Sequence, residues 1–108
     1  MAEVIGVVDI VVAEGRQDAL KEAFAACARG THAEEGCLAY ALHVDNADPL
    51  HFVLLERWRS QEDLDAHMTK PYVADLFAFA GGEGNLAAAP SLAFTTALGI
   101  GDPAKASI

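Results

Sequence analysis

The chain has 108 residues, of which 16 are acidic and 7 are basic, so its formal net charge is −9. An acidic surface without a Lys/Arg cluster repels phosphate backbones, which argues against nucleic-acid binding. Apolar residues make up 53% of the chain, enough for one folded domain, and the length leaves no room for a second core. No apolar run approaches the roughly 20 residues of a membrane helix.

The first predicted strand covers residues 4–12, an almost continuous run of Val and Ile. Such a run is typical of a strand that is covered on both faces. Asp9 interrupts it, which indicates either a pocket residue or a buried hydrogen bond. Apolar residues then recur at helical spacing over residues 16–35. We expect this helix to continue through Gly30 and to stop at Gly36 in a left-handed conformation.

Alternating residues predict two more strands, at residues 38–45 and 51–59, joined as a hairpin by a short segment rich in turn formers. Ser60, followed by Asp63 three positions later, resembles a capping box at the start of a short helix. A second helical segment is predicted to begin at Pro71, because proline favours the first position of a helix.

The last strand is predicted at residues 89–98, within a domain of residues 1–98 that a loose tail, residues 99–108, follows. The resulting order β-α-β-β-α-β is that of the split βαβ or ferredoxin-like fold. We therefore expect an α+β protein, with a four-stranded antiparallel sheet and helices on one of its faces. The other face has no cover within one chain.

The candidate chemistry depends on a histidine and on two residues of the third strand. Histidine is the residue type whose ordinary pKa is close enough to 7 for it to act as an acid, a base or a hydrogen-bond donor, which makes His67 a candidate for that chemistry. Alternatively, His67 fixes its helix onto the sheet. Glu56 and Trp58 share one strand face, and a carboxylate on that apolar face needs a partner, such as His67, Arg57, Arg59 or a backbone donor. Trp58 is either a wall for an aromatic ligand or a core residue.

The remaining histidines and the cysteines give no sign of a metal site, and the N-terminal residues give no sign of a signal peptide. The other three histidines lack metal-ligand spacing, and the cysteines, Cys27 and Cys37, lack the spacing of a zinc or CxxC motif. The N-terminus has no basic region before its apolar stretch. We expect a cytoplasmic protein with reduced thiols, no metal and no membrane contact.

Three segments, taken in order, resemble the antibiotic biosynthesis monooxygenase (ABM) domain. They are residues 35–40 (EGCLAY), 52–58 (FVLLERW) and 60–67 (SQEDLDAH). The family pattern is Glu-Gly before a strand that bears Tyr, then Glu-x-Trp, then a short helix that ends in His. The likeness extends from Val4 to Leu98. It implies a homodimer whose sheets pack face to face as a dimeric α/β barrel, with a small-molecule pocket between the sheet and the helices of each subunit.

The resemblance also implies an activity, the oxidation of a hydroxylated aromatic or quinol-type molecule by O2 without a cofactor. An electron-rich phenolate reacts with oxygen directly, so the protein has to bind, deprotonate and shield it. By position, His67 and Glu56 would be catalytic, as base or donor and as orienting carboxylate, and Trp58, Tyr72 and Asp9 would contact the substrate. Tyr72 stands where many relatives carry a second His, and Asp9 stands near the Asn of haem-degrading relatives, which argues against haem.

Two other functions stay open at this point. One is a non-enzymatic dimeric module that binds a small ligand, for example in a stress response. The other is an isomerase of a small carbonyl compound.

Overall fold

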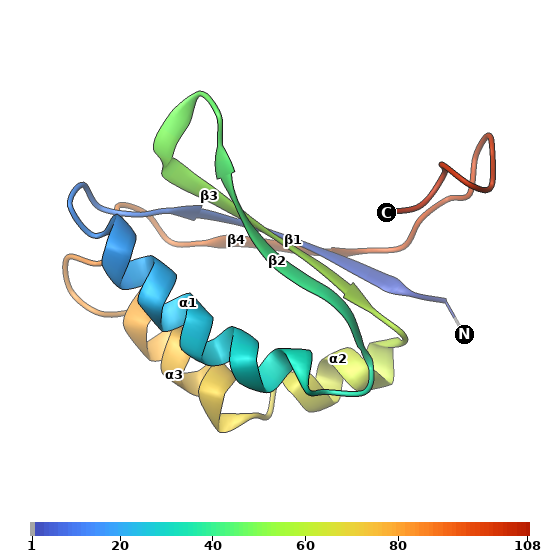
Figure 1. Cartoon of the computed structure of the whole chain (residues 1–108), viewed down its shortest axis with the longest axis horizontal. Helices are drawn as coiled ribbons and strands as arrows, with labels where there is room; N and C mark the ends of the chain where they lie inside the picture. The colour runs from blue at the N-terminus through green and yellow to red at the C-terminus, as the bar shows by residue number, and fades with distance from the viewer. Residues whose placement is uncertain (1) are drawn as a thin grey trace.

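Residues 2–108 are described by a computed structural model, shown in Figure 1. The elements follow one another in the order β1 (Val4–Val11), α1 (Gln17–His32), β2 (Cys37–Asp45), β3 (Asp48–Trp58), α2 (Gln61–His67), α3 (Pro71–Ala80) and β4 (Ser91–Thr95). The predicted order is confirmed, and Pro71 begins α3 as expected. The last strand is shorter than the predicted residues 89–98.

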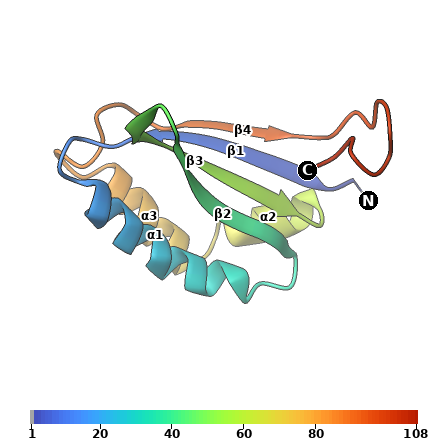
Figure 2. The same cartoon turned by 45° about the horizontal axis from the view of Figure 1, so that its top comes forward.

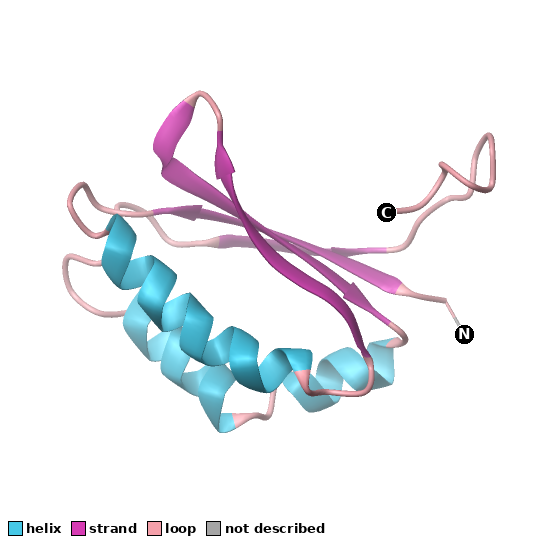
Figure 3. Cartoon of the chain, viewed as in Figure 1, coloured by secondary structure: helices cyan, strands magenta, loops and turns pink. Residues whose placement is uncertain are grey.

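The four strands form one antiparallel sheet in the order β2-β3-β1-β4. Figure 3 shows two layers, with the strands in one and the helices in the other. The helices lie against a single face of the sheet, and Figure 2 shows the opposite face free of them. The structure is therefore the predicted α+β, ferredoxin-like arrangement. None of the helices in residues 2–108 has the length and apolar character needed to cross a bilayer.

Strand β1 carries apolar side chains on both faces, as its sequence predicted. Its even-numbered residues, among them Val8 and Ile10, are buried beneath the helices, whereas its odd-numbered residues are half-buried on the opposite face. Asp9 belongs to this second set. Strand β3 alternates in the same way, with Leu54 and Glu56 buried on the helix side.

Helix α1 continues through Gly30, but it ends at His32 and does not extend to Gly36. The prediction of a left-handed stop at Gly36 is wrong, since Ala33 closes the helix in the right-handed conformation and Gly36 has no positive φ. Glycine is required there for a different reason. A Cβ on Gly36 would collide with the side chain of Asp63, which lies in the first turn of α2.

The predicted cap of α2 is confirmed, and it fixes the short helix that carries His67. The Ser60 hydroxyl oxygen accepts a hydrogen bond from the backbone N–H of Asp63 (3.2 Å) and donates one to the Asp63 carboxylate (2.7 Å). Leu64, one turn further on, is 2% exposed. Because positions three apart share a helix face, burying Leu64 also turns His67 toward the sheet.

Candidate active site

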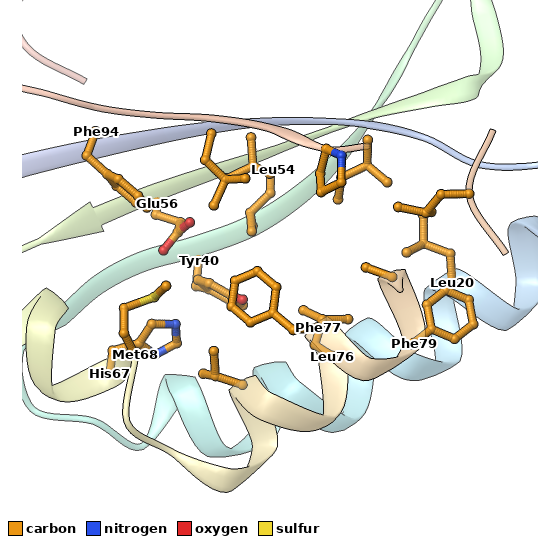
Figure 4. Close-up of a pocket in the computed structure, with 17 residues that line it drawn as sticks. Leu20, Tyr40, Leu54, Glu56, His67, Met68, Leu76, Phe77, Phe79 and Phe94 are labelled. Carbon is orange, nitrogen blue, oxygen red and sulfur yellow. The ribbon is translucent and has the colours of Figure 1, made fainter. Parts of the chain in front are cut away.

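A cavity lies between the sheet and the helices, and Figure 4 shows the side chains around it. The space free of atoms between these side chains is about 630 Å³, and this figure includes open solvent at the mouth of the cavity. Its wall contains residues of every strand and every helix, and nearly all of them are apolar. The polar side chains in the wall are Tyr40, Glu56 and His67.

His67 is 2% exposed and occupies the last position of α2. Its Nδ1 lies 2.8 Å from Oε2 of Glu34. Since an ionised carboxylate only accepts hydrogen bonds, Nδ1 carries the proton, and in the neutral imidazole Nε2 keeps its lone pair. The hydrogen bond of His67 within residues 2–108 is the one at Nδ1, and Nε2 makes none. Every fully buried side-chain nitrogen or oxygen in these residues has a hydrogen-bond partner, so the unbonded Nε2 is not fully buried. Nε2 is therefore reachable from the cavity and able to accept a proton.

Glu34 holds two polar side chains at once. The same Oε2 atom also accepts a hydrogen bond from the Tyr72 hydroxyl, at 2.7 Å. Partial burial and the Glu34 carboxylate raise the pKa of Tyr72 to about 12. Tyr72 thus stays a neutral donor, and it reaches His67 through Glu34. It does not line the cavity, so the structure does not bring Tyr72 to the position of a substrate contact.

Glu56 is 5% exposed, and its carboxylate points toward the imidazole of His67 in Figure 4. Its Oε1 accepts a hydrogen bond from the indole Nε1 of Trp58, at 2.9 Å. Burial raises the pKa of Glu56, and the Trp58 hydrogen bond and the charge of His67 oppose part of that rise. The side-chain donor to this carboxylate is thus Trp58, which was not among the partners expected from the sequence, and Arg57 and Arg59 bond Glu3 and Asp63 instead.

Trp58 is fully buried and does not line the cavity. Its ring centroid lies 4.5 Å from that of His67, and the two rings are tilted by 41°. The indole therefore supports His67 from behind and binds Glu56, while other side chains form the wall.

Asp9 lies on the opposite face of the sheet, away from the cavity. Its Oδ1 is 2.8 Å from Nε2 of His51, whose Nδ1 is 2.9 Å from Oδ2 of Asp45. Of the two readings that the sequence left open for Asp9, the hydrogen bond is the one observed, although it is only partly buried. The structure thus brings together His67 and Glu56 at the cavity, with Trp58 and Tyr72 behind them and Asp9 elsewhere.

Sequence reasoning missed Glu34. The predicted helix of residues 16–35 included it, whereas in the structure α1 ends at His32 and Glu34 lies in the loop before β2, so helical spacing does not give its side-chain direction. Its one signal was its place directly before Glu35-Gly36, the first part of the motif on which the family resemblance depends.

The sequence profile of the antibiotic biosynthesis monooxygenase family matches residues 3–78, so this chain belongs to that family. None of the curated proteins is significantly similar to it. Among solved structures, PA3566 from Pseudomonas aeruginosa is 28% identical, with a TM-score of 0.77 over 91% of this chain and 96% of its own. Rv0793 from Mycobacterium tuberculosis is 26% identical, with a TM-score of 0.79 over 87% and 93%.

A third structure carries the description of antibiotic biosynthesis monooxygenase itself. It is 23% identical, with a TM-score of 0.79 over 88% of this chain and 98% of its own. At this identity the likeness concerns the fold alone. The predicted family and fold class are confirmed.

Proposed function

We propose that the protein is a cofactor-independent monooxygenase that oxidises a hydroxylated aromatic or quinol-type molecule with O2. The observation that carries the proposal is His67, whose Nδ1 is bound to Glu34 while Nε2 is free at an apolar cavity. That arrangement suits a general base with a fixed tautomer, because the hydrogen bond at one ring nitrogen leaves the other as the acceptor.

In the proposed reaction, Nε2 of His67 takes the proton of a substrate hydroxyl, and the resulting electron-rich ring reacts with O2. One oxygen atom enters the ring, where a C–H bond becomes C–OH, and the other atom leaves as water. The substrate supplies all four electrons, two for the new hydroxyl group and two in going from quinol to quinone. The protein's part is to bind and deprotonate the ring in a cavity that excludes water.

Glu56 is proposed to orient the substrate. Because burial raises the pKa of this carboxyl group, a larger fraction of it is protonated at a given pH, and the protonated form can donate a hydrogen bond to a ring oxygen. Trp58 and Tyr72 then act through their partners, Glu56 and Glu34, and not by contact with the substrate.

We also propose a homodimer in which a second copy covers the helix-free face of the sheet. This face presents half-buried apolar side chains from its two central strands, including Ile5, Val7, Val53 and Leu55. Burying such a surface against an identical one is the ordinary driving force of a stable dimer. Sedimentation equilibrium tests this: we expect a dimer for the wild type and dissociation for Leu55→Asp. A wild-type chain that stays a folded monomer would overturn the proposed homodimer, and with it the dimeric α/β barrel that the family resemblance implies.

Both cysteines are free thiols. Reduced thiols are typical of a reducing compartment, so we propose that the protein works in the cytoplasm.

The proposed activity is tested by O2 uptake of metal-free protein supplied with a panel of hydroquinones. We expect turnover by the wild type and by His43→Ala, which changes an exposed histidine outside the cavity, and loss of turnover in His67→Ala. Absence of turnover above background, or equal turnover by His67→Ala, would contradict the proposal. Turnover in the absence of oxygen would favour an isomerase, and binding without product would favour a ligand-binding module.

A further inference from the structure

The polar groups of the cavity are gathered at one end of it. Glu56 of β3 pairs with Gly6 of β1, which in turn pairs with Phe94 of β4, so these residues form one row across the sheet. Figure 4 shows His67 and Glu56 together at this end of the cavity, with Leu20 and Phe79 at the other. A bound hydroxyl group finds side-chain hydrogen-bond partners only at the first end.

The cavity then runs along the sheet away from that row. Val8 and Ile10 form its floor, and Leu86, which forms an isolated bridge with Val12, lies at the far end. The lining residues Phe94 and Leu86 pair with Gly6 and Val12, which are six positions apart in the sequence, and this separation corresponds to about 20 Å of strand. This distance exceeds the length of a one-ring or two-ring quinol. Such a molecule held by His67 would leave the far part of the cavity empty.

The far part has no polar side chain in its wall. It is formed by Leu20, Phe79, Ala80 and Leu86, together with Ile10 and Pro90. A hydroxyl or carbonyl group placed there would lose its water without gaining a side-chain partner, which is unfavourable. An extended polycyclic polyphenol is therefore a poor match. A hydrocarbon chain is a good match, because each methylene group that leaves water there improves binding.

The rim of the cavity is apolar as well. Met68, Phe77, Leu92 and Phe94 line it and are each 40–46% exposed. Exposed apolar side chains that gather in this way are typical of a binding surface. They offer a path by which an apolar chain enters from solvent between α3 and β4.

From these observations we propose that the substrate is amphipathic, a hydroxylated ring at His67 and Glu56 that bears an alkyl or prenyl chain along the remaining cavity. The proposal rests on the proposed function for the role of the ring, and it adds the chain. The binding gain from the chain comes from apolar burial alone, so it is measurable without turnover.

The test measures dissociation constants by quenching of Trp58 fluorescence and by calorimetry, with naphthohydroquinone and its ethyl, hexyl and decyl derivatives under anaerobic conditions. We expect affinity to rise with chain length by up to roughly fourfold per added methylene, until the chain reaches the far end. A hydroxylated tricyclic quinol of similar length should bind more weakly than the decyl compound. Equal affinity along the series, or tighter binding of the tricyclic quinol, would overturn the proposal.

A variant pair locates the chain. Ala80→Phe narrows the far end, and we expect it to remove most of the gain from the hexyl and decyl chains. Ala78→Phe makes the same change two residues away on the exposed side of α3 and should keep that gain. If Ala80→Phe kept the full gain in affinity from the hexyl and decyl chains, the placement of the chain at the far end would be wrong. If this variant does not fold, the dependence of wild-type affinity on chain length remains the test of the proposal.

The outcomes separate the two proposals. A ring that binds and is oxidised, with no benefit from the chain, overturns the amphipathic substrate and leaves the oxygenase. A chain that improves binding without any O2 uptake overturns the oxygenase. If no compound of the series binds, both proposals fail.

Discussion

Each side of the sheet has a histidine that is hydrogen-bonded to carboxylate: His67 of α2 lies on the helix side, and His51 of β3 lies on the opposite side. The two histidines are suited to different roles. On the helix side, the side chains of His67 and Glu34 are 3% and 13% exposed, and one ring nitrogen is free. On the opposite side, the side chains of His51 and Asp9 are 26% and 48% exposed. Both ring nitrogens of His51 are bound to carboxylates. A histidine that keeps one nitrogen for a ligand can act as a base, whereas one that is clamped on both sides can only hold its neighbours together.

The largest effect should come from exchanging the two histidines for alanine separately. His67→Ala should lower kcat/KM for O2 uptake by roughly 10²–10⁴-fold, the usual contribution of a general base. His51→Ala should change it only a few-fold, since no atom of His51 reaches the cavity. Similar losses in the two variants, measured with the same hydroquinone, would contradict the distinction between the two faces.

A smaller loss is expected for Glu34→Gln, where the side-chain carbonyl still accepts one hydrogen bond but the charge is gone. We expect kcat/KM to fall by roughly 10–100-fold, as Glu34 acts only by positioning His67. No loss in Glu34→Gln, or a loss as large as that of His67→Ala, would contradict this positioning role.

Trp58→Phe should affect stability, because it removes the donor to a buried carboxyl group. We expect a loss of about 1–3 kcal/mol in the free energy of unfolding. The variant should raise the pKa of Glu56 further, and stability linked to a raised carboxyl pKa is present at acid pH and is lost as the pH rises through that pKa. Urea titrations at acid and neutral pH should therefore show a larger loss at neutral pH.

The matched control for that prediction is Glu56→Gln in the Trp58→Phe background. Removing the titratable group should remove the pH dependence of the loss. An equal loss at both pH values in Trp58→Phe alone would argue that only packing is affected.

The smallest effect is expected on the helix-free face. Hydrogen bonds to Asp45 and Asp9 raise the pKa of His51 above its ordinary 6.5, and the bond to His51 is the main cause that lowers the pKa of Asp45 below its ordinary 3.8. The hydrogen bonds of His51 to Asp9 and Asp45 therefore stabilise the fold fully at a pH between 3.8 and 6.5. Their contribution is lost as the pH rises through the raised pKa of His51, or falls through the lowered pKa of Asp45.

Denaturant titration of His51→Gln against the wild type checks this sign. The difference in unfolding free energy should be largest at a pH between 3.8 and 6.5 and should shrink at mildly alkaline pH. A difference that stays the same from this interval to mildly alkaline pH would mean that His51 contributes by packing and not by its charge.

The sequence was sufficient for the element order and for the sharing of faces within strands, because side chains alternate with a period of two. It placed Asp9 with the other odd-numbered residues of β1, but it did not reveal which face the helices cover. A strand that is apolar on both sides carries no such signal. The position of Asp9 therefore became clear only from the packing of α1 and α3.

Similar limits apply within the site. Glu56 and Trp58 were correctly placed on one face, yet whether the indole faces the cavity depends on how α2 packs against the end of β3. Glu34 contacts His67 across 33 residues of chain, and its loop position gives no periodic pattern to follow. Contacts of this kind follow from tertiary packing, which local sequence patterns do not record.

The most direct test of the central assignment is a turnover of the metal-free protein with a hydroquinone under isotopically labelled dioxygen, followed by mass spectrometry of the product. We expect one labelled oxygen atom in the product of the wild type and no product above background from His67→Ala. Unlabelled product, with both oxygen atoms released as hydrogen peroxide, or equal labelling by His67→Ala, would contradict it.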